Sequence, residues 1–181
     1  MLRASIFIDL ADSSVTEALG RALARALPAA VPASAGQAGA GAAAAAQSGA
    51  SQGAVMYLQG DLGAGKTTCV RSLLRALGVQ GLVRSPTYTL LETYLLPKLT
   101  CIHVDLYRLQ VLSEVDELGL RDLFGPGCLL LVEWPERGGA SLPTADVEVL
   151  LCYVGDARQA RVLARSPLGA DWLDNLDTTL A

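Results

Sequence analysis

One glycine-rich loop carries the residue types that bind phosphate groups. It reads Gly60-Asp61-Leu62-Gly63-Ala64-Gly65-Lys66-Thr67-Thr68, which is glycine, four residues and then Gly-Lys-Thr. The glycines allow consecutive backbone N–H groups to face an anion without interference from a Cβ atom. We expect Lys66 to contact the β- and γ-phosphates of a nucleotide and the Thr67 hydroxyl to contact Mg²⁺, which prefers oxygen ligands. Residues 61–68 are therefore predicted to form a nucleotide-phosphate site.

Two carboxylates could complete that site. Glu133 directly follows the apolar run at residues 128–132, and Asp105 lies in the strand-like segment at residues 102–107. In open α/β sheets, acidic groups that hold Mg²⁺ or orient a nucleophile lie at the carboxyl ends of strands beside the phosphate loop. Either carboxylate could be the direct metal ligand, and either could instead be an exposed or helix-capping group. With Lys66 they are the candidate catalytic residues.

Three other side chains have a functional and a structural interpretation. Thr87, in Ser85-Pro86-Thr87-Tyr88-Thr89, could sense the γ-phosphate as switch segments do, or it could belong to a plain turn. Trp134 could stack on or gate a nucleotide, or it could be a core aromatic. His103, the single histidine, shares a strand face with Asp105, although a lone histidine is more often structural.

The elements that must position these residues follow from the hydrophobic pattern. A strand at residues 55–59 precedes the loop, and helical apolar spacing from Thr67 to Leu77, closed by Gly78, follows it. Further strands are predicted at 5–10, 90–95, 100–107, 128–132, 146–154 and 159–165, and helices after Asp12 up to Pro28, at 113–120 with Ser113 as its N-cap, and at 121–124. The predicted fold is α/β and similar to P-loop NTPases, with a central, mostly parallel sheet, β-hairpins and flanking helices.

Composition limits the domain organisation and the partners. A chain of 181 residues is long enough for one α/β domain, which we place at residues 1–165. Residues 28–53 contain almost only Ala, Gly, Ser, Pro and Gln and are predicted to be a flexible insertion, and residues 166–181 a C-terminal tail. The net charge of −4 and a sequence pI near 4.9 leave no basic face for nucleic acid, so any RNA role should run through a partner.

Cysteine spacing and hydropathy argue against a zinc or redox protein and against a membrane-spanning or secreted one. Cys69, Cys101, Cys128 and Cys152 form no C-x-x-C pair, and we expect four small, buried apolar residues rather than a zinc or redox site. No apolar run approaches the length that crosses a bilayer. Asp9 lies where a signal peptide needs an apolar stretch, so the expected location is the cytoplasm.

Five segments together resemble the TsaE family, also called YjeE, the P-loop ATPases of bacterial tRNA threonylcarbamoyladenosine (t6A) synthesis. The segments are residues 60–68, Ser-Pro-Thr-Tyr-Thr-Leu at 85–90, His-Val-Asp-Leu-Tyr-Arg-Leu at 103–109, Glu-Leu-Gly-Leu at 117–120 and Val-Glu-Trp-Pro-Glu at 132–136. Their order and spacing cover about residues 55–165. The second, third and fifth segments are the specific ones, because the first is common to many NTPases.

The resemblance implies roles for several residues. Thr67 and Glu133 contact Mg²⁺, Asp105 supports the metal and hydrolysis, and the segment around Thr87 responds to the nucleotide. More weakly, the resemblance places Asp12 and the hairpin around Arg158 beside the adenosine. The chain departs from the family in its insertion at 28–53 and in Ala157, where a glycine is usual.

The expected function is therefore Mg²⁺-dependent ATP hydrolysis that drives a partner complex. By resemblance that complex is the TsaB–TsaD pair, through which the chain reaches tRNA, with no role for DNA or membranes. No arginine stands out as an internal group for the γ-phosphate, so we expect slow hydrolysis alone and stimulation by partners. The alternatives are a small-molecule P-loop kinase and a non-enzymatic, nucleotide-dependent binding module.

Overall fold

The computed structural model describes residues 4–31 and 53–179. In chain order the elements, of which η2 and η3 are 3-10 helices, are β1 (Ser5–Leu10), α1 (Ser13–Ala26), β2 (Ala54–Gly60), α2 (Lys66–Ala76), β3 (Leu91–Leu96), β4 (Leu99–Asp105), α3 (Ser113–Glu117), α4 (Leu120–Leu123), β5 (Cys128–Glu133), η2 (Pro135–Arg137), η3 (Gly139–Ser141), β6 (Val147–Val154), β7 (Ala157–Ala164) and α5 (Pro167–Asp174). The predicted insertion falls mostly on residues 32–52, which lie outside the described residues, so it stays a prediction.

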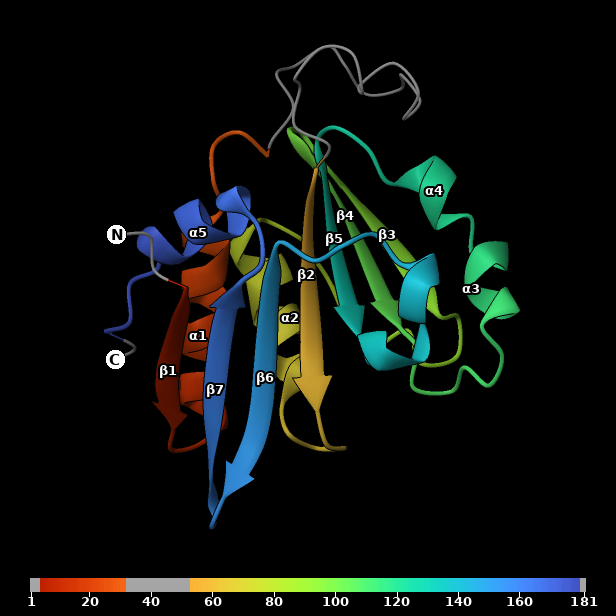
Figure 1. Cartoon of the computed structure of the whole chain (residues 1–181). Coiled ribbons are helices and arrows are strands. Elements are labelled where there is room, and N and C mark those ends of the chain that lie inside the picture. The colour runs from red at the N-terminus through yellow and green to blue at the C-terminus, as the bar shows by residue number, and fades with distance from the viewer. Residues whose placement is uncertain (1–3, 32–52, 180–181) are drawn as a thin grey trace.

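All described strands join one sheet in the order β1-β7-β6-β2-β5-β4-β3. The central strands β6, β2, β5 and β4 run parallel, whereas β1 with β7, β7 with β6 and β4 with β3 are antiparallel. Figure 1 shows these strands side by side, with β2 and β5 in the middle of the sheet. The α/β fold with a parallel centre and two hairpins is confirmed, and the antiparallel pairings lie toward the sheet edges.

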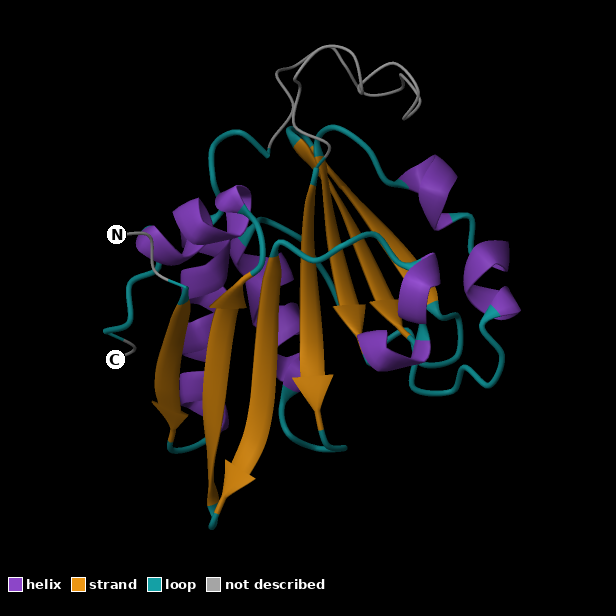
Figure 2. Ribbon diagram, viewed as in Figure 1, coloured by secondary structure: helices purple, strands orange, loops and turns teal. Residues whose placement is uncertain are grey.

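Strand alternation separates two apolar layers on the faces of the sheet. Cys101, Leu129 and Leu131 belong to the cluster that contains the buried residues of α1, α2 and α5. Their neighbours along β4 and β5, such as Ile102 and Leu130, belong to the cluster with α3 and α4. Figure 2 shows α3 and α4 well separated from α1, α2 and α5. Since side chains alternate along a strand, His103 and Asp105 point to the same face as Cys101, the face covered by α2.

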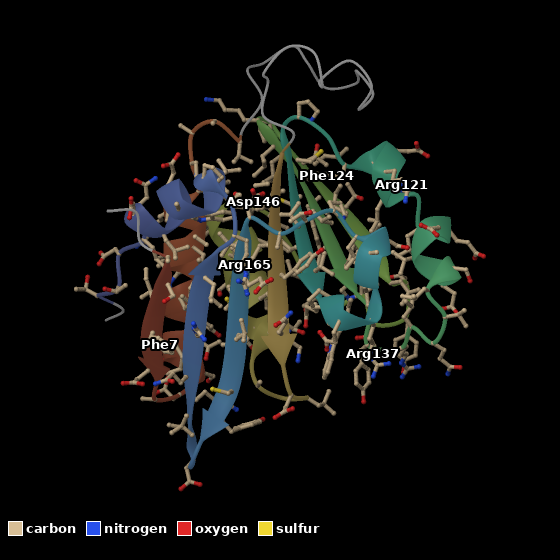
Figure 3. All side chains as sticks on the ribbon, in the orientation of Figure 1. Phe7, Arg121, Phe124, Arg137, Asp146 and Arg165 are labelled. Atoms are coloured by element: carbon tan, nitrogen blue, oxygen red, sulfur yellow. The ribbon has the colours of Figure 1, made fainter. Side chains whose placement is uncertain are left out.

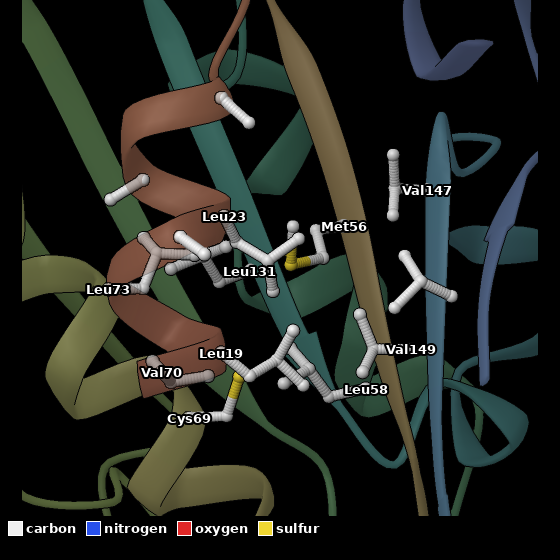
Figure 4. Close-up of a cluster of buried hydrophobic side chains, with 14 of the residues drawn as sticks. Leu19, Leu23, Met56, Leu58, Cys69, Val70, Leu73, Leu131, Val147 and Val149 are labelled. Atoms are coloured by element: carbon white, nitrogen blue, oxygen red, sulfur yellow. The ribbon is translucent and has the colours of Figure 1, made fainter. Parts of the chain in front are cut away.

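Helices α1 and α2 pack unusually closely. A Cβ atom on Gly20 would lie 2.1 Å from Ser72 Oγ and 2.3 Å from the Cys69 carbonyl oxygen, so only glycine fits at this crossing. Leu19 and Leu23 of α1 extend into the same buried cluster as α2 and β2 (Figure 4). This packing holds α2, and therefore the loop that ends at its first residue.

Residues 167–174 of the predicted C-terminal tail form helix α5. Trp172 is completely buried, and its indole N–H donates to the Leu23 carbonyl oxygen 2.9 Å away. Asp146, labelled in Figure 3, joins the helix to the sheet because its carboxylate accepts hydrogen bonds from Ser166 Oγ and from the Val55 N–H. A helix of eight residues has too few turns for a strong apolar period, which is why the pattern missed it.

Three of the four cysteines lie in the core. Cys69, Cys101 and Cys128 are buried as predicted, but Cys152 is exposed because the end of β6 extends beyond the core. Helix α3 has Leu112 as its N-cap without a side-chain hydrogen bond, so the Ser113 cap was wrong. Within the described part of the chain, no helix is both long enough and apolar enough to span a membrane.

Candidate functional site

The glycine-rich loop connects β2 to α2, as the sequence predicts. Gly65 has a φ of 110°, a left-handed conformation that favours glycine, and Lys66 follows it as the first residue of α2. The first N–H groups of a helix have no partner within the helix, so they can bind an anion there. Thr16 of α1 supports the loop from behind, because a Cβ atom on Gly65 would lie 3.1 Å from Thr16 Cγ2.

A cleft of about 300 Å³ opens where β4 and β5 end beside this loop. Residues from the loop, from the segment after α2 and from both strand ends line it: Leu62, Gly63, Gly65, Lys66, Thr67, Thr68, Ser85, Thr87, Asp105, Tyr107, Glu133 and Trp134. The structure therefore brings together most of the residues that the sequence singled out. Ala64 is buried within the loop, and Asp61 contributes its carbonyl oxygen to Lys66 rather than a side chain to the cleft.

Lys66 is held by its own loop. The side chain is buried, and its ammonium group donates to the carbonyl oxygens of Gly60 at 2.6 Å and Asp61 at 2.8 Å. Burial lowers the pKa of Lys66, and the surrounding carboxylates, Glu133 foremost, act in the opposite direction. A phosphate oxygen would offer the ammonium group a charged acceptor in place of neutral carbonyls, which makes a stronger hydrogen bond.

Thr67 and Glu133 meet across the cleft. Thr67 Oγ1 lies 2.9 Å from Glu133 Oε1 and 2.8 Å from Oε2, so the hydroxyl donates to a carboxylate whose two oxygens are both in reach. Glu133 is buried, and its Oε1 also lies 2.9 Å from His103 Nε2. The first turn of α2 and the end of β5 thus present a hydroxyl and a carboxylate to the same point.

Asp105 forms a second polar group in the cleft. Its Oδ2 accepts hydrogen bonds from Ser85 Oγ and, at 2.9 Å, from Thr87 Oγ1, and the two hydroxyls lie 2.6 Å apart. Its Oδ1 accepts the Tyr107 backbone N–H at 2.9 Å. The segment after α2 is therefore tied to the end of β4 through Asp105, and a switch role for Thr87 stays a prediction.

Trp134 forms one wall of the cleft and also packs, partly buried, against the apolar cluster on the α3 and α4 side of the sheet. Its indole lies 3.8 Å from Lys66 Nζ, measured to the ring centroid, and 5.0 Å from the Tyr107 ring. Its φ of 60° is left-handed, which is rare for a large side chain. A strained residue at the mouth of a cleft is a feature often found at functional sites.

Asp12 and Arg158, predicted beside an adenosine, lie outside the cleft lining. Asp12 is the N-cap of α1, and its pKa is lowered because its carboxylate accepts hydrogen bonds from the Ser14 hydroxyl and from the Val15 and Ser14 N–H groups. Arg158 reaches the loop from β7 and donates to the Gly63 carbonyl oxygen at 3.4 Å. Arg158 therefore contacts the loop, whereas the hydrogen bonds of Asp12 lie within the start of α1, and contact of either residue with a nucleotide stays a prediction.

The sequence pattern did not single out three residues at this site. Ser85 and Tyr107 line the cleft, and both could have been found because they stand beside the candidates Thr87 and Asp105 in short polar motifs. Tyr153 donates from the β6 end to the Leu62 carbonyl oxygen at 3.3 Å. That contact joins residues far apart in the chain, so no local signal could have revealed it.

The donor set fits a hard divalent cation bound together with phosphate. Thr67 and Glu133 supply oxygen atoms, and Asp105 supplies a second carboxylate nearby. In residues 4–31 and 53–179, no group of three or more His, Cys, Asp or Glu side chains could form a metal centre by itself. Mg²⁺ sites typically have few protein ligands, and phosphate oxygens and water molecules complete the coordination.

Comparisons with known proteins agree with the geometry. The model of a family described as threonylcarbamoyl adenosine biosynthesis protein TsaE matches residues 10–161. The chain belongs to the TsaE family. The tRNA threonylcarbamoyladenosine biosynthesis protein TsaE of Haemophilus influenzae is 46% identical over 115 residues, which cover 64% of this chain and 73% of that protein. The protein of the same name from Treponema pallidum is 38% identical over 112 residues, covering 61% and 82%.

The fold also matches a solved structure. The crystal structure of Bacillus subtilis YdiB superposes with a TM-score of 0.66 and 23% identity, covering 96% of this chain and 94% of that one. This match shows a shared P-loop NTPase-like fold. Membership in the TsaE family and the fold together imply nucleotide binding.

Proposed function

We propose that this TsaE-family chain binds ATP with Mg²⁺ in the cleft, hydrolyses it slowly, and supports t6A formation on tRNA. The t6A role rests on the family description and on the names of the relatives. The TsaB–TsaD pair is the proposed partner, on the resemblance of the sequence motifs, and tRNA is reached through that complex in the cytoplasm.

Six residues of the cleft then have defined tasks. Lys66 binds the terminal phosphates, and Thr67 and Glu133 hold Mg²⁺. When bound, Mg²⁺ neutralises phosphate charge and stabilises the charge that develops in hydrolysis. Asp105 orients the attacking water, and Thr87 brings the preceding segment to the same carboxylate. Trp134 shields this part of the cleft from bulk water.

The single observation that carries the proposal is the meeting of Lys66, Thr67 and Glu133 beside one loop. Lys66 and Thr67 come from the start of α2, and Glu133 comes from the end of β5. The packing of the strands or of the loop does not by itself explain why these three polar groups lie together. Of the two alternatives, a P-loop kinase usually needs an arginine-bearing lid. Arg137, the one arginine soon after Glu133, donates to the Leu109 carbonyl oxygen at 3.2 Å and lies 5.8 Å from the Trp134 ring centroid, so structural contacts account for it.

Slow turnover in isolation follows from the charges around the cleft. Lys66 is the only lysine or arginine among the described residues that line it. A second cation at the γ-phosphate contributes roughly 10³–10⁵ in rate where P-loop enzymes use one. A docking partner that supplies such a group, or that orders the residues around Asp105, would therefore increase the rate strongly.

Steady-state phosphate release from ATP, with and without the TsaB–TsaD pair, tests the proposal. We expect slow release from the chain alone, a dependence on Mg²⁺, and a clear increase when the pair is added. Transfer of labelled phosphate to a small acceptor would instead support a kinase. Nucleotide binding without turnover in either condition would support a binding module.

A further inference from the structure

His103 is a buried polar residue to which the proposed mechanism gives no task. It lies in β4, its side chain is completely buried, and it does not line the cleft. It therefore cannot contact a nucleotide there. Within the described residues, the one hydrogen bond of its side chain joins Nε2 to Glu133 Oε1 at 2.9 Å.

The environment of the second ring nitrogen indicates where the proton lies. His103 Nδ1 is buried and has no hydrogen-bond partner among the described residues. A buried N–H without an acceptor is rarer and more costly than an unpaired acceptor. The neutral ring with its proton on Nε2 leaves only a lone pair unsatisfied at Nδ1, and it lets Nε2 donate to the Glu133 carboxylate.

This hydrogen bond complements the one from Thr67. The Thr67 hydroxyl lies almost equally far from both Glu133 oxygens, at 2.9 and 2.8 Å, so Thr67 alone does not fix the rotation of the carboxylate. His103 contacts Oε1 only. Among the residues that the structure describes, this pair of contacts holds Oε1 between two donors and leaves Oε2 with a single hydrogen-bond partner, Thr67.

We propose that His103 is a positioning residue that fixes the rotation of the Glu133 carboxylate and so presents Oε2 to Mg²⁺. The inference rests on the proposed function. Residues that hold a metal ligand in place from behind typically change metal affinity about 10- to 100-fold when they are removed. His103 therefore affects the Mg²⁺-dependent part of nucleotide affinity without touching the nucleotide.

Two substitutions separate this role from simple packing. In His103→Gln the side-chain amide can reach the position of imidazole Nε2, so its N–H₂ can donate to Glu133 Oε1. In His103→Asn the amide is one methylene shorter and matches Nδ1 instead, so it cannot reach. Both variants carry a polar amide at the same buried position, and a merely structural role predicts that the smaller Asn and the longer Gln both behave as packing defects.

The experiment is calorimetric titration of ADP into the full chain, with Mg²⁺ and with EDTA, for the wild type and both variants. We expect His103→Asn to lose about tenfold of the affinity gain that Mg²⁺ gives the wild type. His103→Gln should keep most of that gain, and affinity in EDTA should be the same in all three proteins. Equal Mg²⁺-dependent gains in His103→Asn and wild type would overturn the inference.

Folding and the proposed function are checked in the same experiment. The EDTA titrations report whether each variant is folded, because the loop and Lys66 bind ADP phosphates without the metal. If His103→Asn does not bind ADP in EDTA and is therefore not folded, His103→Gln decides the question. A loss of about tenfold in the Mg²⁺-dependent affinity gain of a folded His103→Gln variant would overturn the inference. A wild type with no Mg²⁺-dependent gain would contradict the proposed function itself, which is a different result from normal wild-type behaviour with an unaffected variant.

Discussion

Lys66 and Trp134 face each other across the cleft, with the ammonium nitrogen 3.8 Å from the indole centroid. The same ammonium group also donates to two carbonyl oxygens of its loop. A cation over an indole gains about 0.5–2 kcal/mol, depending on how dry the contact is. A nucleotide must replace these contacts when it takes Lys66 as a phosphate ligand, so the surroundings of Trp134 should change on binding.

Tryptophan fluorescence can report that change. The chain has two tryptophans, Trp134 at the cleft and Trp172 buried under α1. We expect ATP with Mg²⁺ to alter the emission of the wild type and to leave the emission of Trp134→Phe unchanged, because Trp172 is completely buried and does not line the cleft. A nucleotide response that persists in Trp134→Phe would place the binding site elsewhere.

The lowered pKa of Lys66 predicts how stability changes at alkaline pH. Between the lowered value in the folded chain and the ordinary value of 10.5, the unfolded chain binds more protons than the folded one. The free energy of unfolding contributed by Lys66 therefore rises with pH across that interval. Urea titrations of wild type and Lys66→Met should show a difference that shifts in favour of the wild type as the pH approaches 10.5.

Other alkaline titrations cancel in that comparison. Burial raises the pKa of Tyr57 to about 12, which lowers stability as the pH passes the ordinary tyrosine value, but it does so in both proteins. A stability difference between wild type and Lys66→Met that stays constant with pH would show that the ammonium group is not desolvated in the nucleotide-free chain.

Helix α5 should be essential for stability. Trp172→Ala removes a completely buried indole and is expected to lower the free energy of unfolding by about 3–5 kcal/mol. The matched control is Phe7→Ala, since Phe7 is 60% exposed on β1 and its loss should change stability by no more than about 0.5 kcal/mol. Chemical denaturation compares the two. Similar small effects would mean that α5 does not pack as described.

Thiol reactivity tests the cysteine environments. Burial raises the pKa of Cys69 and Cys101 to about 12 and that of Cys128 above its usual range, so these thiols are protonated and shielded at neutral pH. Cys152 is exposed at the end of β6. A thiol reagent should modify one group rapidly in the native chain and all four after denaturation. Cys152→Ser should abolish the rapid phase. A rapid phase that remains in this variant would contradict the burial of the other three cysteines.

Much of the fold could be predicted because the signals are local. The β2, loop and α2 unit is encoded by a β-rich run, a glycine motif and helical spacing in one stretch of chain. The β5 strand, with every residue buried, matches the continuous apolar run expected for a strand covered on both faces. Residues such as Glu133 and Asp105 could be assigned to the site because they stand where such strands end.

The features that were missed depend on contacts between distant segments. Trp172 is buried because α5 returns to α1, and the hydrogen bond to Leu23 joins residues 149 positions apart. The exposure of Cys152 depends on how far β6 extends beyond its neighbours. The partner of His103 was likewise hidden, because β4 and β5 meet only in the folded sheet. Local patterns carry none of this information.

The central claim is that this cleft hydrolyses ATP with Lys66 on the terminal phosphates. The most direct measurement is the rate of phosphate release from ATP in Mg²⁺ by wild type, Lys66→Ala and Lys98→Ala, where Lys98 is an exposed lysine in the turn between β3 and β4. We predict slow release by the wild type, an unchanged rate in Lys98→Ala, and loss of release in Lys66→Ala. Equal rates in Lys66→Ala and wild type would contradict the account.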